Sequence, residues 1–151
     1  MIERISARVL LVTSNLDVLL FSSLDPGDPD RPRHWFSVGG GVEEGESLEG
    51  AACREVLEET GHRLPAVGER LLTRHASYDF EGEHYEQEET IFVAWVEHFE
   101  PRTDHWTDVE RRADARHKWW SIDELTHTDE VVWPENLATL IRSLNVPDKP
   151  K

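Results

Sequence analysis

Three carboxylates in the segment 55–59 have the spacing needed to hold a metal ion. Glu55, Glu58 and Glu59 stand at positions i, i+3 and i+4. On a helix that turns about 100° per residue, these side chains share one face. Their mutual repulsion disfavours the helix by about 0.2–0.5 kcal/mol per pair, and a hard divalent cation such as Mg²⁺ or Mn²⁺ would reverse that effect. The alternative for such a pattern is a solvated acidic helix face.

The residues around the carboxylates predict a helix from Leu48 to Thr60. Ser47 is a good N-cap, and Glu49 in the first turn is favoured by the helix dipole. Gly61 is placed to end the helix in the left-handed conformation that glycine adopts easily. The segment therefore has start and stop signals that agree with each other.

Three consecutive glycines, residues 39–41, precede this helix. They predict a loop whose backbone can approach a ligand closely. Arg54 is expected to point about 100° away from Glu55 around the helix, where it can pair with a carboxylate of the loop such as Glu46. The sequence thus predicts a glycine loop fixed to an acidic helix.

Seven residues in this stretch follow the pattern G-x5-E-x7-R-E-V-L-E-E-x-G, and they are Gly40, Glu46, Arg54, Glu55, Glu58, Glu59 and Gly61. The segment from Gly40 to His62 resembles the Nudix box of the Nudix hydrolase family at each of these positions. Two positions depart from the family pattern. His62 stands where an aliphatic residue is usual, and Val38 where a proline is often found. Neither departure replaces a carboxylate.

The resemblance implies a metal-dependent enzyme that cleaves a nucleoside diphosphate linked to another moiety by attack of water on a phosphoanhydride. It implies that Mg²⁺, with Mn²⁺ as a substitute, is held by the three helix glutamates and a backbone carbonyl near Gly40, while Glu46 with Arg54 fixes the loop to the helix. One of these glutamates, or Glu110 or Asp114 in the polar segment 98–116, would deprotonate the water. The alternative is a non-catalytic, nucleotide-sensing protein, whose usual mark is a degenerate box.

Two aromatic residues are candidates for contact with a substrate. Trp35 and Phe36 point to opposite faces of a short predicted strand, so one can enter the core while the other stacks on a base, an interaction of about 1–3 kcal/mol. The alternative is that both are packing residues. Tyr78 lies 16 positions after His62, and a tyrosine in this region resembles family members that act on diadenosine polyphosphates. A nucleoside triphosphate or a dinucleoside polyphosphate is therefore the favoured substrate.

Length and composition predict one globular domain over residues 1–151. The chain has 31 acidic and 16 basic residues, a formal net charge of −15, and a hydrophobic fraction of 38%. This charge disfavours nucleic-acid polymers and anionic membranes as partners. The family resemblance implies that the partner is a small-molecule nucleotide or another diphosphate. A monomer and a homodimer are both compatible with the sequence.

Cys53 is the only cysteine, which excludes an intramolecular disulfide and fits a reducing cytoplasm. It is expected on the helix face opposite the glutamates, as core filler. The longest apolar run, Ile91 to Val96, is six residues long, too short for a membrane span. The N-terminal segment lacks the form of a signal peptide, so we expect a cytoplasmic location.

The remaining pattern predicts an α/β (α+β) protein. Strands are expected over 5–13, 18–21, 34–37, 69–80, 84–97 and 117–121, with an exposed loop over 24–32 and a helical turn over 122–125. A last helix is expected to open at Trp133-Pro134 and to bury Leu137, Leu140, Ile141 and Leu144. The resemblance implies that these elements form the Nudix fold, a mixed β-sheet sandwiched between α-helices.

Overall fold

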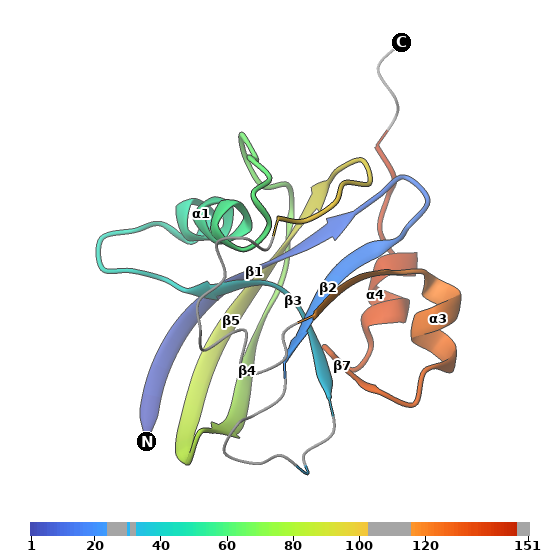
Figure 1. Cartoon of the computed structure of the whole chain (residues 1–151). Helices are drawn as coiled ribbons and strands as arrows, with labels where there is room; N and C mark the ends of the chain where they lie inside the picture. Colours follow the sequence, from blue (N-terminus) through green and yellow to red (C-terminus); the bar gives the residue numbers. More distant parts are fainter. Residues whose placement is uncertain (24–29, 31–32, 103–115, 148–151) are drawn as a thin grey trace.

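The computed structural model of the chain describes residues 1–23, 30, 33–102 and 116–147. Its strands are β1 (Ile2–Val12), β2 (Val18–Ser23), β3 (His34–Gly41), β4 (Arg70–Phe80), β5 (Glu83–Trp95), β6 (Arg116–Trp120) and β7 (Val131–Trp133). The helices are α1 (Leu48–Thr60), α3 (Ile122–His127) and α4 (Leu137–Arg142). Figure 1 shows these elements around one strongly twisted sheet.

The sheet is mixed, with β1 near its centre. The strand order is β4-β5-β1-β2-β3-β7, with β6 paired to β2 and an additional pairing between β1 and β3. The β1–β5 and β3–β7 pairs are parallel, and the other pairs are antiparallel. Helix α1 covers one face of the sheet, while α3 and α4 lie on the other side (Figure 1). The predicted fold class, a mixed sheet between helices, is confirmed.

Two hydrophobic clusters hold these layers together. The cluster beneath α1 buries Ala7, Val9, Leu11, Leu19, Val38, Ala51, Ala52, Val56, Phe92 and Ala94. The cluster beneath α3 and α4 buries Leu10, Val12, Val18, Leu20, Trp35, Ile91, Val93, Trp120, Leu137 and Ile141. Alternate residues of β1 enter different clusters, because successive side chains of a strand point to opposite faces. The central strand is therefore buried on both sides.

The predicted helix over 48–60 is confirmed with both of its caps. The Ser47 side chain accepts a hydrogen bond from the Gly50 amide. Gly61 has φ of 76°, and its amide donates to the Leu57 carbonyl. Cys53 is half-buried, and burial raises the pKa of its thiol. No helix in the described part of the chain is long and apolar enough to cross a membrane.

The structure corrects the predicted glycine loop. Residues 39–41 are the end of β3, not a loop, because β1 pairs with them in antiparallel register from Ser6↔Gly41 to Arg8↔Gly39. The connection to α1 is the segment 42–47 instead. The three glycines therefore lie in a regular strand that runs alongside α1.

The C-terminal helix also differs from its prediction. Trp133 ends strand β7, and α4 begins at Leu137, three residues after Pro134. Residues 131–133 form a parallel ladder with β3, from His34↔Val131 to Phe36↔Trp133. This pairing holds the chain extended up to the proline, so Pro134 cannot be the first helical residue. The predicted apolar stripe is nevertheless correct, since Leu137 and Ile141 are buried and Leu140 and Leu144 pack against them.

Candidate metal and phosphate site

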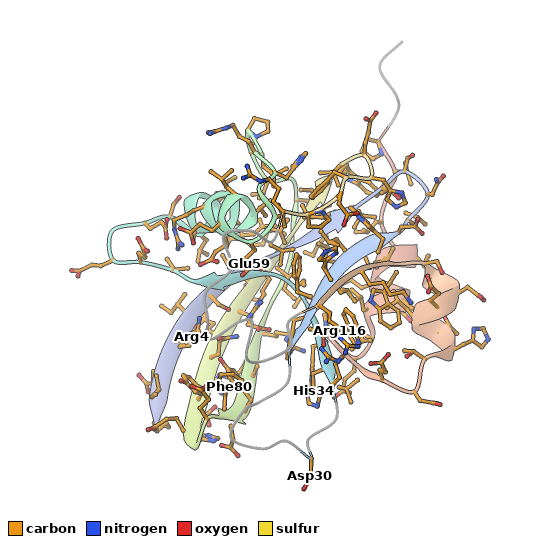
Figure 2. The ribbon with its side chains drawn as sticks, viewed as in Figure 1. Arg4, Asp30, His34, Glu59, Phe80 and Arg116 are labelled. Carbon is orange, nitrogen blue, oxygen red and sulfur yellow. The ribbon has the colours of Figure 1, made fainter. Side chains whose placement is uncertain are left out.

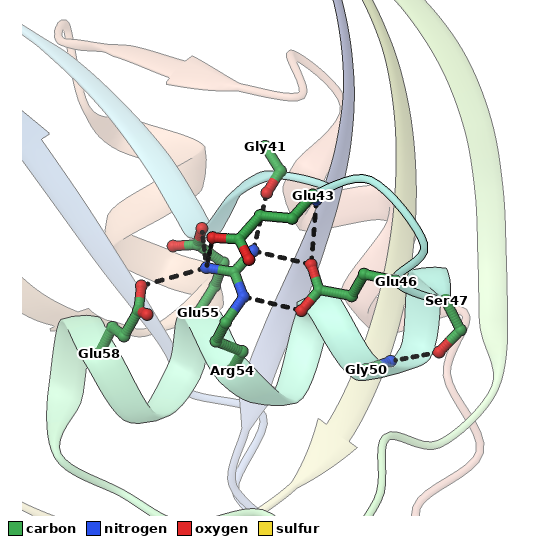
Figure 3. A network of polar contacts seen from close by, with 8 residues as sticks. All are labelled: Gly41, Glu43, Glu46, Ser47, Gly50, Arg54, Glu55 and Glu58. Carbon is green, nitrogen blue, oxygen red and sulfur yellow. Dashed lines mark hydrogen bonds and ion pairs between the residues drawn. The ribbon is translucent and has the colours of Figure 1, made fainter.

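Arg54 is the centre of the polar network that connects α1 to the loop before it (Figure 3). Its Nε and Nη2 atoms donate to the two carboxylate oxygens of Glu46 at 2.8 and 2.9 Å. Nη2 also donates to the Gly41 carbonyl oxygen at 2.9 Å. Glu46 in turn accepts a bond from the Glu43 amide at 3.1 Å. The predicted Glu46–Arg54 pair is therefore present in bidentate form, which fixes both distance and orientation.

Arg54 also contacts two of the helix carboxylates, which corrects the prediction that it points away from them. Its Nη1 atom lies 3.0 Å from Glu55 Oε1 and 3.1 Å from Glu58 Oε2. The arginine stem is long and flexible, so the angle between Cβ directions on a helix does not fix where a guanidinium ends. With the more distant Glu43 carboxylate, 3.9 Å from Nη1, one arginine thus lies within ion-pair distance of four carboxylates from the loop and the helix.

The ion pair between Glu46 and Arg54 shifts the pKa values of both groups. Hydrogen bonds from Arg54 and then from the Glu43 backbone lower the pKa of Glu46 to about 2. The Glu46 carboxylate in turn raises the pKa of Arg54 above its ordinary value. Both groups are therefore fully ionised at neutral pH, and the loop stays attached to the helix across the physiological range.

Glu59 lies between α1 and the strands beneath it (Figure 2). Burial raises the pKa of Glu59 to about 8 and exceeds the opposing effect of the Arg8 charge. The neighbouring Glu55 charge raises this pKa further, while a hydrogen bond from the Gly39 amide lowers it. A carboxylate in this position needs additional positive charge to ionise at neutral pH, which a bound cation supplies.

Gly40 makes room for Glu55. A Cβ atom at residue 40 would lie 2.6 Å from Glu55 Oε1 and 2.8 Å from its Oε2. Any side chain at residue 40 would therefore force the carboxylate out of this position. The glycine allows the strand backbone at residue 40 to lie directly against an acidic side chain.

The donor atoms of this region fit a hard divalent cation. They are carboxylate and carbonyl oxygens, the ligands that Mg²⁺ and Mn²⁺ prefer, and the lack of a side chain at Gly40 lets the Glu55 carboxylate lie against the strand backbone. Within the described ranges, no three acidic, histidine or cysteine side chains converge on a single ion position. Arg54 engages both Glu55 and Glu58 in this arrangement, and Glu58, whose side chain is 58% exposed, is free to turn.

The two predicted aromatic contacts lie in different environments. Trp35 is 5% exposed and packs edge-on against Trp120 at 5.2 Å, and its Nε1 atom donates to Glu130. This burial argues against a base-stacking role for Trp35. Tyr78 stacks on Tyr85 at 5.1 Å, and its hydroxyl contacts Arg4 and Gln87.

Glu110 and Asp114, predicted as an additional ligand or base, lie outside the described residues. Sequence reasoning missed Arg8 on β1, whose side chain is only 18% exposed. It placed Glu89 on β5, 10% exposed, only on a polar strand face that could border a substrate cleft, with simple exposure as the alternative. Their signal was present in the sequence, because each interrupts or borders a strongly apolar strand segment.

The Glu59 environment predicts a pH effect on stability when no metal is bound. The ordinary pKa of 4.5 rises to about 8 on folding, so between these values the folded chain retains a proton that the unfolded chain has released. The free energy of unfolding should therefore fall as the pH rises from 5 to 8. We expect the free energy of unfolding to fall by about 2 kcal/mol. This is less than the full change in the pKa of Glu59 implies, because the residue is only half-buried and solvent screens its charge.

This effect is measured by thermal unfolding in EDTA, in parallel for the wild-type chain and Glu59→Gln. The histidines also titrate in this range, so the difference between the two proteins isolates Glu59. The variant should lose stability less steeply with rising pH. Equal slopes would contradict the assignment.

Comparison with known proteins identifies the family of the chain. Residues 3–141 match the NUDIX domain family. Over 102 residues the chain is 31% identical to a Mus musculus protein named oxidized purine nucleoside triphosphate hydrolase, an alignment that covers 68% of this chain and 57% of that protein. The chain therefore spans less than two thirds of the length of this relative.

Solved structures show the same architecture. A NUDIX hydrolase from Nitrosomonas europaea has a TM-score of 0.61 at 26% identity, with 93% of this chain and 86% of that chain covered. The MutT NUDIX hydrolase from Burkholderia pseudomallei has a TM-score of 0.62 at 21% identity, with 96% and 100% covered. Because the match extends from the first strand to the last helix, this chain belongs to the NUDIX domain family.

Proposed function

We propose that the chain is a Mg²⁺-dependent hydrolase that cleaves a phosphoanhydride bond in a nucleoside triphosphate or a dinucleoside polyphosphate. The observation that carries this proposal is the arrangement around Arg54. This residue contacts Glu46, Glu55, Glu58 and the Gly41 carbonyl within 3.1 Å. An acidic face ordered in this way beside a glycine strand is suited to concentrating cations, and polyphosphates need cations for approach to a chain with a net charge of −15.

Each residue then has a defined task. Glu55, Glu58 and Glu59, with the carbonyl of Gly40, would hold the metal. Bound Mg²⁺ neutralises phosphate charge and makes a water molecule more acidic. Arg54 and Glu46 orient the carboxylates by fixing the loop to the helix. Glu59 must release its proton to become a ligand, so metal binding should strengthen with rising pH.

The class of substrate is supported by two separate observations. The mouse relative is named for hydrolysis of oxidized purine nucleoside triphosphates, which favours a triphosphate such as 8-oxo-dGTP. Tyr78 stands where the resemblance favours dinucleoside polyphosphates, and one face of its ring is already covered by Tyr85. The triphosphate is therefore the first substrate to test.

The experiment is a panel of nucleoside triphosphates including 8-oxo-dGTP, diadenosine polyphosphates, ADP-ribose and sugar nucleotides, assayed for phosphate or pyrophosphate release. Each is tested with Mg²⁺, with Mn²⁺ and with EDTA, beside Glu58→Gln. Turnover of a triphosphate or dinucleoside polyphosphate that requires metal and is lost in the variant is the expected result. If no compound in the panel is hydrolysed but a nucleotide still raises the melting temperature, the chain is a nucleotide-sensing protein and the proposal is wrong.

A further inference from the structure

Arg8 crosses from the central strand to the glycine strand. Its Nη1 atom donates to the carbonyl oxygens of Ser37 and Gly39 at 3.0 and 3.3 Å. Its Nε atom lies 3.5 Å from Glu89 Oε1. This second contact is an ion pair and not a hydrogen bond, since Arg8 Nε is buried without a hydrogen-bond partner among the described residues. Arg8 therefore connects the backbone of β3 to a carboxylate on β5.

Glu89 is held from two further sides. The Gln87 side-chain amide donates to its Oε1 atom at 2.6 Å, and Arg74 Nε lies 2.9 Å from its Oε2 atom. Gln87 is 1% exposed and Glu89 is 8% exposed. Burying charged groups to this extent has a large desolvation cost, and hydrophobic residues of similar size often stabilise such a position better. A contribution to stability alone thus explains this cluster poorly.

Gly39 connects this cluster to the candidate metal site. Arg8 and Gly39 are paired in register across β1 and β3, and Gly39 has φ of +151°. A Cβ atom at residue 39 would lie 2.9 Å from Arg8 Cδ and 2.3 Å from the Ala7 carbonyl oxygen. The glycine thus leaves the space through which the Arg8 side chain passes. The Gly39 amide donates to the Glu59 carboxylate, which also lies in the field of the Arg8 charge.

We infer that Arg8, anchored by Glu89, is a positioning residue for the metal site. It holds the Ser37–Gly39 backbone so that the Gly39 amide and the Arg8 charge keep Glu59 oriented for metal binding. This inference rests on the proposed function, because it assigns Glu59 to the metal. It adds a basic residue from β1, far from the box in sequence, to the groups on which the site depends.

The test measures Mn²⁺ affinity by electron paramagnetic resonance in the absence of substrate, for the wild-type chain, Arg8→Gln and Arg8→Lys. Loss of a group that orients a metal ligand typically weakens metal affinity about 10- to 100-fold, and we expect about tenfold for Arg8→Gln. Arg8→Lys keeps the charge but not the two-carbonyl contact, so we expect a loss of about threefold. With Mg²⁺ and substrate, the half-saturating metal concentration should shift in parallel.

Arg74→Gln is the matched control, because it removes the other arginine from Glu89 without touching β3. Both Gln variants should lose similar thermal stability, but Arg74→Gln should keep Mn²⁺ affinity within about twofold of wild type, since no metal ligand loses its orientation. Wild-type affinity in Arg8→Gln, or equal losses in both variants, would overturn the inference. If Arg8→Gln does not fold, wild-type affinity in Arg8→Lys would overturn it. A wild-type chain that binds no Mn²⁺ would overturn the proposed function and the inference with it.

Discussion

Glu58→Gln and Glu59→Gln are each expected to lower kcat by at least about 100-fold, because each removes a charge that would hold the metal at the reacting phosphate. The fold should survive both changes. The Glu58 side chain is 58% exposed, and replacing Glu59 by its neutral isostere removes a carboxylate whose pKa burial raises to about 8. Glu59→Gln should even be the more stable protein at pH 8 without metal.

The measurement is steady-state turnover of the substrate that the panel identifies, with circular dichroism as the test of folding. Glu49→Gln is the matched control, since Glu49 lies in the same helix and forms an exposed ion pair with Arg70 at 3.2 Å. Its kcat should stay within about twofold of wild type, because an exposed pair of this kind contributes little. Near wild-type turnover in folded Glu59→Gln would remove Glu59 from the site.

Arg54→Met is expected to have the largest effect on stability, together with a smaller loss of activity. The change leaves the Glu46, Glu55 and Glu58 carboxylates without their shared cation and frees the Gly41 carbonyl. Removing one partner of a buried charged network costs about 3–5 kcal/mol. The Arg54 side chain is 23% exposed, so we expect about 2 kcal/mol, with kcat reduced at least about tenfold because the loop no longer holds its place.

Urea unfolding with and without Mg²⁺ measures this effect. Mg²⁺ should restore part of the lost stability, because a cation replaces some of the missing positive charge near the carboxylates. Arg70→Met is the control, since its exposed pair with Glu49 should contribute less than about 1 kcal/mol. Equal stability losses in the two variants would show that Arg54 is an ordinary surface charge.

The local features of the site could be predicted from the sequence because they depend on residues near one another in the chain. The bounds of α1 follow from Ser47 and Gly61, and the Glu46–Arg54 pair follows from the spacing of the box. The apolar stripe of α4 was equally readable, since its contacts follow from helix periodicity. Each of these predictions needed only one element and its ends.

The features that could not be predicted depend on pairing between distant segments. Residues 39–41 are part of a strand because β1 pairs with them. Strand β7 forms because it pairs with the edge of β3. The burial of Trp35 reflects packing against Trp120, which is 85 positions away in the chain. Arg8 and Glu89 likewise become neighbours only when β1 and β5 align. Local propensity contains no information about such partners.

The parallel pairing of β1 with β5 has a consequence for folding during synthesis on the ribosome. The ladder runs from Ile2↔Tyr85 to Val12↔Trp95, so β1 pairs with a strand that is synthesised about 80 residues later. At about 5–20 residues per second, this wait lasts several seconds to more than ten. During that time β3 is already present to pair with β1 on one side, but β5 is missing on the other, and loop-closure entropy slows the pairing of β1 with β5. The full β1–β5 ladder can therefore form only after Trp95 has been synthesised.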